Sequence, residues 1–144
     1  MANYNLYDDI NESELLSLSE TLTSDISTNQ SALTSFSESL TEDMWKASAK
    51  ETLKTGYTKI GEVFTELTSE IEKVQKACNA ITLYKTARTQ ALKYQEQIEA
   101  KENNVDENGT IIDQVGLAVL KGLKTACEQV MEKSEAEVNG ICGG

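Results

Sequence analysis

The fold is decided by the middle of the chain, where residues 71–98 read IEKVQKACNAITLYKTARTQALKYQEQI. Apolar side chains recur in this stretch at steps of three and four residues, a spacing that places them on one face of an α-helix. Neither proline nor glycine interrupts it. The stretch therefore predicts a helix with one face suited to packing against other helices.

The same spacing continues towards both ends of this stretch. No proline or turn sequence lies between Ser48 and Asn103, so we predict one helix of about 55 residues, on the order of 80 Å long. Gly56 and Gly61 weaken a helix interior, and we expect a neighbour to approach closely there. The positions on the predicted face are Leu53, Tyr57, Ile60, Phe64, Leu67, Ile71, Val74, Cys78, Ile81, Tyr84, Arg88, Leu92, Gln95 and Ile98.

Two shorter amphipathic helices are predicted over residues 11–41 and 111–138. The first is rich in Ser and Thr, which form helices poorly, so its stability should depend on the helix that covers its apolar face. The apolar positions of the first helix are Leu15, Leu18, Leu22, Ile26, Leu33, Phe36 and Leu40. Those of the last helix are Ile112, Val115, Val119, Leu123, Cys127 and Val130, with Val138 and Ile141 after them.

These lengths predict an all-α fold built on an antiparallel helical hairpin with a very long second helix. The first helix folds back at Trp45 and covers the first half of the long helix, and the last helix folds back at Gly109 onto its C-terminal half. We assign residues 1–103 to the hairpin and residues 104–144 to the turn, the third helix and a flexible Gly-rich end. A chain of 144 residues fits a single domain.

The charge of the chain is concentrated in its first third. The net charge is −11, and residues 1–45 hold nine acidic residues and no Lys or Arg, so every basic residue lies at or beyond Lys46. This distribution argues against nucleic acid or an anionic membrane and favours a protein partner with a basic or mixed surface. The alternative interpretation is a solvated acidic face that keeps the protein soluble.

The composition also argues against an enzyme. The chain has no histidine, which removes the commonest general base and zinc ligand. The paired acids Glu70 and Glu72, and likewise Glu99 and Glu102, are expected on solvated faces, where a raised pKa is not expected. We therefore predict no catalytic residues and no cofactor.

Three cysteines occur without the spacing of a metal site. Cys78 and Cys127 fall on core-facing stripes and are expected to behave as small apolar residues. Cys142, followed by two glycines, is expected to be an exposed free thiol.

Neither a membrane span nor a cleavable signal peptide is predicted. No apolar run approaches the roughly 20 residues that cross a bilayer, and the first residues lack a basic and then apolar pattern. We expect no membrane insertion, and a protein that is cytoplasmic or exported without a cleaved signal.

The second turn has the beginning of a calcium-binding loop. Asn104, Asp106, Asn108 and Gly109 match the first ligand positions of an EF-hand loop, but Val115 stands where the bidentate acid belongs. At most weak calcium binding is expected. The alternative is an Asn-Gly turn that leads into the last helix.

Trp45, the only tryptophan, is followed by Lys46 and Ala47 at the predicted first turn. A Trp-x-small element between two helices resembles the Trp-Xaa-Gly family of small type VII secretion proteins, the ESAT-like helical hairpins, with Ala47 in place of glycine. The resemblance covers roughly residues 10–100. It implies a bacterial, non-enzymatic protein, a secretion substrate or adaptor, that pairs into homo- or heterodimers of hairpins and is secreted without a signal peptide.

One motif departs from that family. Its export signal, Tyr-x-x-x-Asp/Glu after the second helix, is missing, because Tyr84 is followed four residues later by Arg88. Tyr4 and Asp8 have the spacing, but at the opposite end of the chain. The departure implies that a partner chain carries the signal.

Incomplete coverage is expected where the long helix passes from the first helix to the third. The apolar side chains there, Ile71, Val74 and Ile81, are predicted to form a seam for a protein partner. The alternative function is a structural subunit of a helical filament or virion-associated assembly. A pore-forming protein is disfavoured by the polarity of the first helix.

Overall fold

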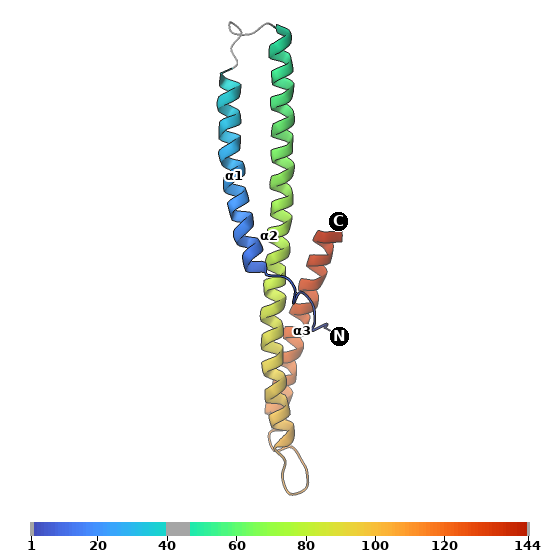
Figure 1. The fold of residues 1–144 in the computed structure, drawn as a ribbon. Helices are drawn as coiled ribbons and strands as arrows, with labels where there is room; N and C mark the ends of the chain where they lie inside the picture. Colours follow the sequence, from blue (N-terminus) through green and yellow to red (C-terminus); the bar gives the residue numbers. More distant parts are fainter. Residues whose placement is uncertain (1, 40–46, 144) are drawn as a thin grey trace. The chain divides into compact units, whose positions relative to one another are not determined.

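The protein is all-helical in a computed structural model that describes residues 2–39 and 47–143 (Figure 1). The three helices are α1 (Glu12–Glu38), α2 (Ala47–Asn103) and α3 (Gln114–Gly143). The predicted all-α class, with a very long second helix, is confirmed.

The chain divides into two compact units. The hairpin unit is Ser13–Gln75, and the second unit, here the α3 unit, combines Met1–Glu12 with Lys76–Gly144. This division differs from the sequence-based one after residue 103. The reason is that the N-terminal residues pack with α3 and the second half of α2.

In the hairpin unit α1 lies beside the first half of α2 (Figure 1). Ser19 and Ile26 are the only side chains of residues 13–39 and 49–75 that are buried. The Ser19 hydroxyl donates to Leu16 O at 2.7 Å and accepts a hydrogen bond from Gln75 Nε2 at 3.2 Å. The contact between these helices is therefore thin and partly polar.

The inner face of α1 agrees with the predicted one at Ile26 and Leu33 and differs from it near the start of the helix. Leu16 and Leu33 are half-buried beside the buried Ser19 and Ile26, whereas Leu18 of the predicted face is 54% exposed. The sequence is ambiguous because leucines stand side by side at residues 15 and 16, so two neighbouring stripes both carry the helical spacing.

Polar residues of α1 bond to their own helix. Hydroxyls donate to the carbonyl four residues earlier, as Thr28 does to Ser24 O at 3.1 Å and Thr34 does to Gln30 O at 3.0 Å. These bonds satisfy the hydroxyls, although they add little to helix stability. The helix thus forms despite its Ser/Thr content.

In the α3 unit the second half of α2 packs against α3 and the N-terminal segment. The two buried clusters comprise Ala2, Tyr84, Ala87, Ala91 and Met131, and Ala80, Ile81 and Val138. Cys78, Ile81, Tyr84 and Ile98 of the predicted face are buried as expected, whereas Ala87 and Ala91 face inward in place of the predicted Arg88 and Leu92.

The inner face of α3 is displaced as well. Leu117 and Met131, outside the predicted stripe, are buried, and so is the predicted Val138, whereas Val119 is exposed and Val115 is 77% exposed. The inner positions recur in steps of three and four, as the predicted ones do. Large apolar side chains consequently remain on the outer side of this helix.

Residues 104–113 form a tight turn. Asp106 Oδ1 accepts the backbone N–H groups of Asn108 at 2.9 Å and Thr110 at 3.0 Å. Gly109 has a φ of 79°, a left-handed conformation that glycine adopts without strain. An isolated antiparallel bridge joins Val105 and Ile111.

The glycines of α2 do not mark a close contact. A Cβ atom built on Gly56 or Gly61 would have no neighbour within 4 Å. The expectation of a close approach there was wrong, because both face open space.

Candidate functional site

Part of the predicted turn site cannot be placed. Trp45 and Lys46 lie outside the described residues, and Ala47 is described only as the first residue of α2. The described candidate sites are therefore formed by other residues of the two units.

The predicted partner seam does not form one surface. Val74 is 43% exposed and Ile71 is half-buried, but Ile81 is only 3% exposed. Ile81 packs with Ala80 and Val138 inside the α3 unit. Ile81 must therefore be removed from the seam, because its own chain already covers it.

A larger apolar surface lies on the hairpin unit, and we call it the hairpin face. Its α1 residues are Leu15, Leu18, Leu22 and Phe36. Its α2 residues are Ile60, Val63, Leu67 and Val74. All of them are exposed large hydrophobic side chains.

The two halves of the hairpin face lie on the same side of the hairpin. Along most of each helix the exposed stripe stands one residue before the inner one, as Leu18 does before Ser19 and Val63 before Phe64. One residue is a rotation of about 100° about the helix axis. The two helices run in opposite directions and face each other. A shift of one residue towards the N-terminus of each helix therefore turns both exposed stripes to the same side of the hairpin. The hairpin unit thus carries apolar side chains of both helices on one side, interrupted by the exposed Asp25 and Asn29 of α1 and Glu70 of α2.

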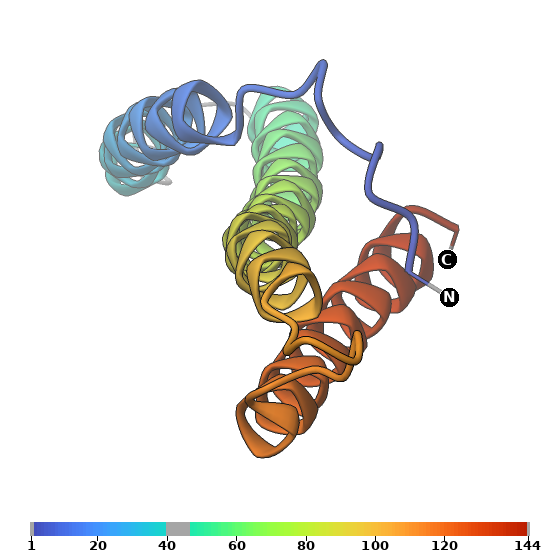
Figure 2. The same cartoon turned by 90° about the horizontal axis from the view of Figure 1, so that it is seen from below.

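The N-terminal residues pack against the helices of the α3 unit and form a second candidate site. We call residues 2–11 the strap; it runs beside the C-terminal half of α3 (Figure 2). Arg88 Nη1 donates to Tyr4 O at 3.1 Å and to Leu6 O at 3.2 Å, and forms an ion pair with Asp8 at 2.7 Å. Each of these bonds holds the strap to α2.

Tyr84 and Lys85 of α2 also form hydrogen bonds with the strap. The fully buried Tyr84 donates its hydroxyl hydrogen to Asn3 O, and its oxygen accepts Leu6 N–H at 3.2 Å. Lys85 Nζ donates to Ile10 O and to Glu12 Oε2, both at 2.7 Å. The bond from Lys85 holds the pKa of Glu12 below its ordinary value.

Two tyrosines of the strap are affected by burial. Burial first, and then the nearby Glu128 carboxylate, raise the pKa of Tyr4 to about 12. Its buried hydroxyl makes no well-formed hydrogen bond within residues 2–39 and 47–143. Burial likewise raises the pKa of Tyr7. Both phenols therefore stay neutral at physiological pH.

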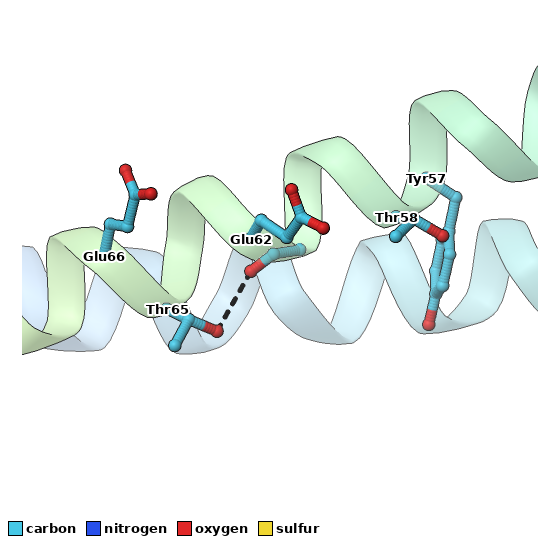
Figure 3. Close-up of a pocket in the computed structure, with 6 residues that line it drawn as sticks. Tyr57, Thr58, Glu62, Thr65 and Glu66 are labelled. Atoms are coloured by element: carbon cyan, nitrogen blue, oxygen red, sulfur yellow. Dashed lines mark hydrogen bonds between the residues drawn. The ribbon is translucent and has the colours of Figure 1, made fainter.

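An open hollow of about 590 Å³ lies along α2 in the hairpin unit. In Figure 3 the Glu66 side chain points away from Thr65, whose hydroxyl donates to Gly61 O at 3.1 Å. Tyr57 and Glu62 complete the labelled polar lining with Thr58. No nucleophile and base converge in it, so it offers no catalytic arrangement.

The calcium-like residues are arranged as a turn. The Asp106 carboxylate bonds to the turn backbone, and Val115 lies in the first turn of α3. Asp113 caps α3, since its Oδ1 accepts Gly116 N–H at 2.9 Å while Oδ2 pairs with Lys101 at 2.6 Å. Lys101, and then Gly116, lower the pKa of Asp113.

The cysteine predictions are confirmed. Cys78 is buried, and burial raises the pKa of its thiol. Cys127 is half-buried against the first core cluster, and Cys142 is exposed. All three are free thiols. Across the described residues no group of three or more His, Cys, Asp or Glu side chains could hold a metal ion.

The sequence predicted no role for the strap. One signal was present, because Tyr4 and Asp8 have the same spacing as Tyr84 and Arg88, with an acid in one pair and a base in the other. The structure joins these pairs through the Asp8–Arg88 ion pair.

Comparison with protein-family models, curated proteins and solved structures gives no match to this chain. Among the helices described, none is long and apolar enough to cross a bilayer.

Proposed function

We propose that this chain is a non-enzymatic helical interaction protein that works as a dimer through the hairpin face. Its biological role in this proposal is that of a type VII secretion substrate or adaptor. The partner is a second helical hairpin, either another copy or a related chain.

The hairpin face is the observation that carries the proposal. It brings apolar side chains from α1 and α2 to one side of a unit whose interior buries only Ser19 and Ile26 among its described side chains. Apolar surface exposed to water is unfavourable, at roughly 25 cal/mol per Å². A second hairpin with a similar face would cover it and form a four-helix arrangement.

The secretion role is supported by the resemblance at Trp45-Lys46-Ala47 and by a hairpin built from α1 and α2. The acidic first helix adds a preference for partners with basic or mixed surfaces, because Glu12–Glu38 contains no Lys or Arg. Export itself is the most specific part of the proposal and needs its own test.

A filament subunit is the alternative, and the outer side of α3 favours it. Val115, Val119, Leu123 and Val130 are exposed along that helix. A chain with two separate apolar surfaces can assemble without closing, whereas one self-complementary surface gives a closed dimer. Large open assemblies in solution would favour this alternative.

The experiment compares two substitutions that add the same charge to α2. Val63→Glu places a carboxylate in the hairpin face, whereas Thr58→Glu places it on the opposite side of the helix. Tagged variants are produced in a bacterium with a type VII machine, and co-purifying chains and exported protein are measured by mass spectrometry. We expect Val63→Glu to lose its partner and its export while Thr58→Glu keeps both.

Two results would contradict the proposal. Equal behaviour of the two variants would remove the hairpin face from the interaction. Export of neither variant nor the unmodified chain, with partner binding intact, would leave the dimer but remove the secretion role.

A further inference from the structure

The strap is held largely through its main chain. Tyr84, Lys85 and Arg88, which lie within two turns of α2, all donate to its backbone. The carbonyl oxygens that accept these bonds are those of Asn3, Tyr4, Leu6 and Ile10. Such contacts recognise the path of a main chain, which here bends and turns between Tyr7 and Ile10, and the side chains then decide which segment is accepted.

Three side chains of the strap supply that selectivity. Tyr7 packs edge-on against Tyr84, with ring centroids 5.1 Å apart. Tyr4 packs against the first core cluster, and Asp8 pairs with Arg88. The groove between α2 and α3 thus fits a segment with two tyrosines and an acid at these spacings.

An empty groove would be unfavourable. Ala87, Ala91 and Met131 belong to the same buried cluster as Ala2, so they would lose apolar cover without the strap. The buried Tyr84 hydroxyl would lose both of its hydrogen-bond partners. The groove therefore needs an occupant with the chemistry of the strap.

The strap is followed directly by a helix of the other unit. It ends where α1 begins at Glu12, and the chain from Ser13 onward belongs to the hairpin unit. The strap of a second copy would offer the groove the same atoms. Exchange of an identical element between copies preserves every one of these contacts, which makes it a low-cost route to association.

We infer that the groove between α2 and α3 is a receptor for the strap and that the strap of a second copy can fill it. This surface is separate from the hairpin face. It gives the chain a second way to bind itself, through a tyrosine-bearing acidic segment.

A fluorescent peptide of residues 2–12 tests the receptor on the full chain. In the Asp8→Arg chain the internal strap is repelled by Arg88, so the peptide should bind on the order of 10-fold more tightly than to the unmodified chain. Asp8 is 61% exposed, so the substitution should leave the helices intact, which circular dichroism verifies. Fluorescence anisotropy gives the affinity.

Asp9→Arg is the matched control for this substitution. It makes the same change of charge one residue later, at an exposed position away from the Asp8–Arg88 ion pair. The peptide should bind this chain as it binds the unmodified one. No binding of the peptide to the folded Asp8→Arg chain, or equal binding to both variants, would contradict the inference that the groove is a receptor for the strap.

Exchange between copies is tested by mixing Asp8→Arg and Arg88→Glu chains, each also carrying Val63→Glu to disable the hairpin face. Each strap is repelled by its own groove and attracted by that of the other chain. We expect a one-to-one complex by light scattering only in the mixture, and an excess of the peptide together with its Asp8→Arg version should dissociate it. If the peptide binds but the chains do not pair, the groove is a receptor for the strap, and the inference that two copies exchange straps is wrong.

Discussion

Tyr84 links the strap to the α3 unit through three kinds of interaction. Its hydroxyl joins two backbone groups of the strap, its ring meets Tyr7 edge-on, and the Arg88 guanidinium lies 5.3 Å from the ring centroid. The side chain is fully buried. Removing any of these interactions therefore leaves polar or aromatic groups without a partner.

Tyr84→Phe keeps the ring and removes only the hydroxyl. Because Asn3 O and Leu6 N–H lose a hydrogen bond, we expect a loss of about 1–3 kcal/mol in the free energy of unfolding measured in urea. Tyr94→Phe is the control, since Tyr94 is a half-buried tyrosine of the same helix. Equal losses for the two variants would show that the bonds of Tyr84 have no special weight.

Glu12 makes the strap sensitive to acid. Its folded-state pKa is below the ordinary 4.5 because Lys85 donates to its carboxylate. A group with a lowered pKa stabilises the fold above its unfolded pKa, and that contribution disappears as the pH falls below 4.5 and through the folded pKa.

Glu12→Gln should therefore weaken the protein at pH 7 and flatten the fall in melting temperature between about pH 5 and pH 3. Glu20→Gln, on the same helix at an exposed position, should retain the fall of the unmodified chain. The measurement is thermal unfolding by circular dichroism across this range. An unchanged slope for Glu12→Gln would refute the assignment.

At the scale of the helix, α3 depends on its displaced inner face. Met131 is fully buried, whereas its neighbour Val130 is 43% exposed. We expect Met131→Ala to cost about 2–5 kcal/mol of unfolding free energy and Val130→Ala less than about 1 kcal/mol. Urea unfolding of both variants measures the difference. A larger loss for Val130→Ala would favour the face predicted from the sequence.

Two glycines of α3 should respond differently to alanine. A Cβ at Gly116 would collide with the Asp113 carboxylate that caps the helix, whereas a Cβ at Gly122 meets nothing within 4 Å. Gly122→Ala should stabilise the protein by about 0.5–1 kcal/mol, because alanine favours a helix interior. Gly116→Ala should gain less than this, and the pKa of Asp113 should rise towards its ordinary value in an NMR titration.

The helices were predictable, and the faces they bury were predictable only in part. Steps of three and four residues predicted all three helices, and the absence of proline predicted the length of α2. Periodicity could not choose between neighbouring stripes, because Leu15 and Leu16 satisfy the same spacing in α1. The choice depends on close packing at Ser19, Ala87 and Ala91, which carry little hydrophobic signal of their own.

The packing of the strap could not be predicted from sequence patterns, for a different reason. Residues 2–11 have no periodicity, and their hydrogen bonds to the second half of α2 join residues about 75 to 84 positions apart in the chain. The contact with Tyr84 also uses backbone atoms, which no side-chain pattern reveals. The hairpin face, in contrast, could have been found by testing both stripes of each helix.

At the scale of the whole molecule, each of the two units has a surface that we propose for association. The hairpin unit exposes the apolar hairpin face, and the α3 unit holds the strap in a groove. In the hairpin unit the contact between the helices is thin, so large apolar side chains remain exposed. In the α3 unit the alanines of α2 leave room for the strap.

The central claim is that the hairpin face pairs two chains, and sedimentation equilibrium of the purified protein tests it most directly. The single-chain mass is 15.8 kDa. We predict a reversible equilibrium between one and two chains that Val63→Glu shifts to the monomer and Thr58→Glu leaves unchanged. A strict monomer at every concentration, with Val63→Glu indistinguishable from the unmodified chain, would contradict the account.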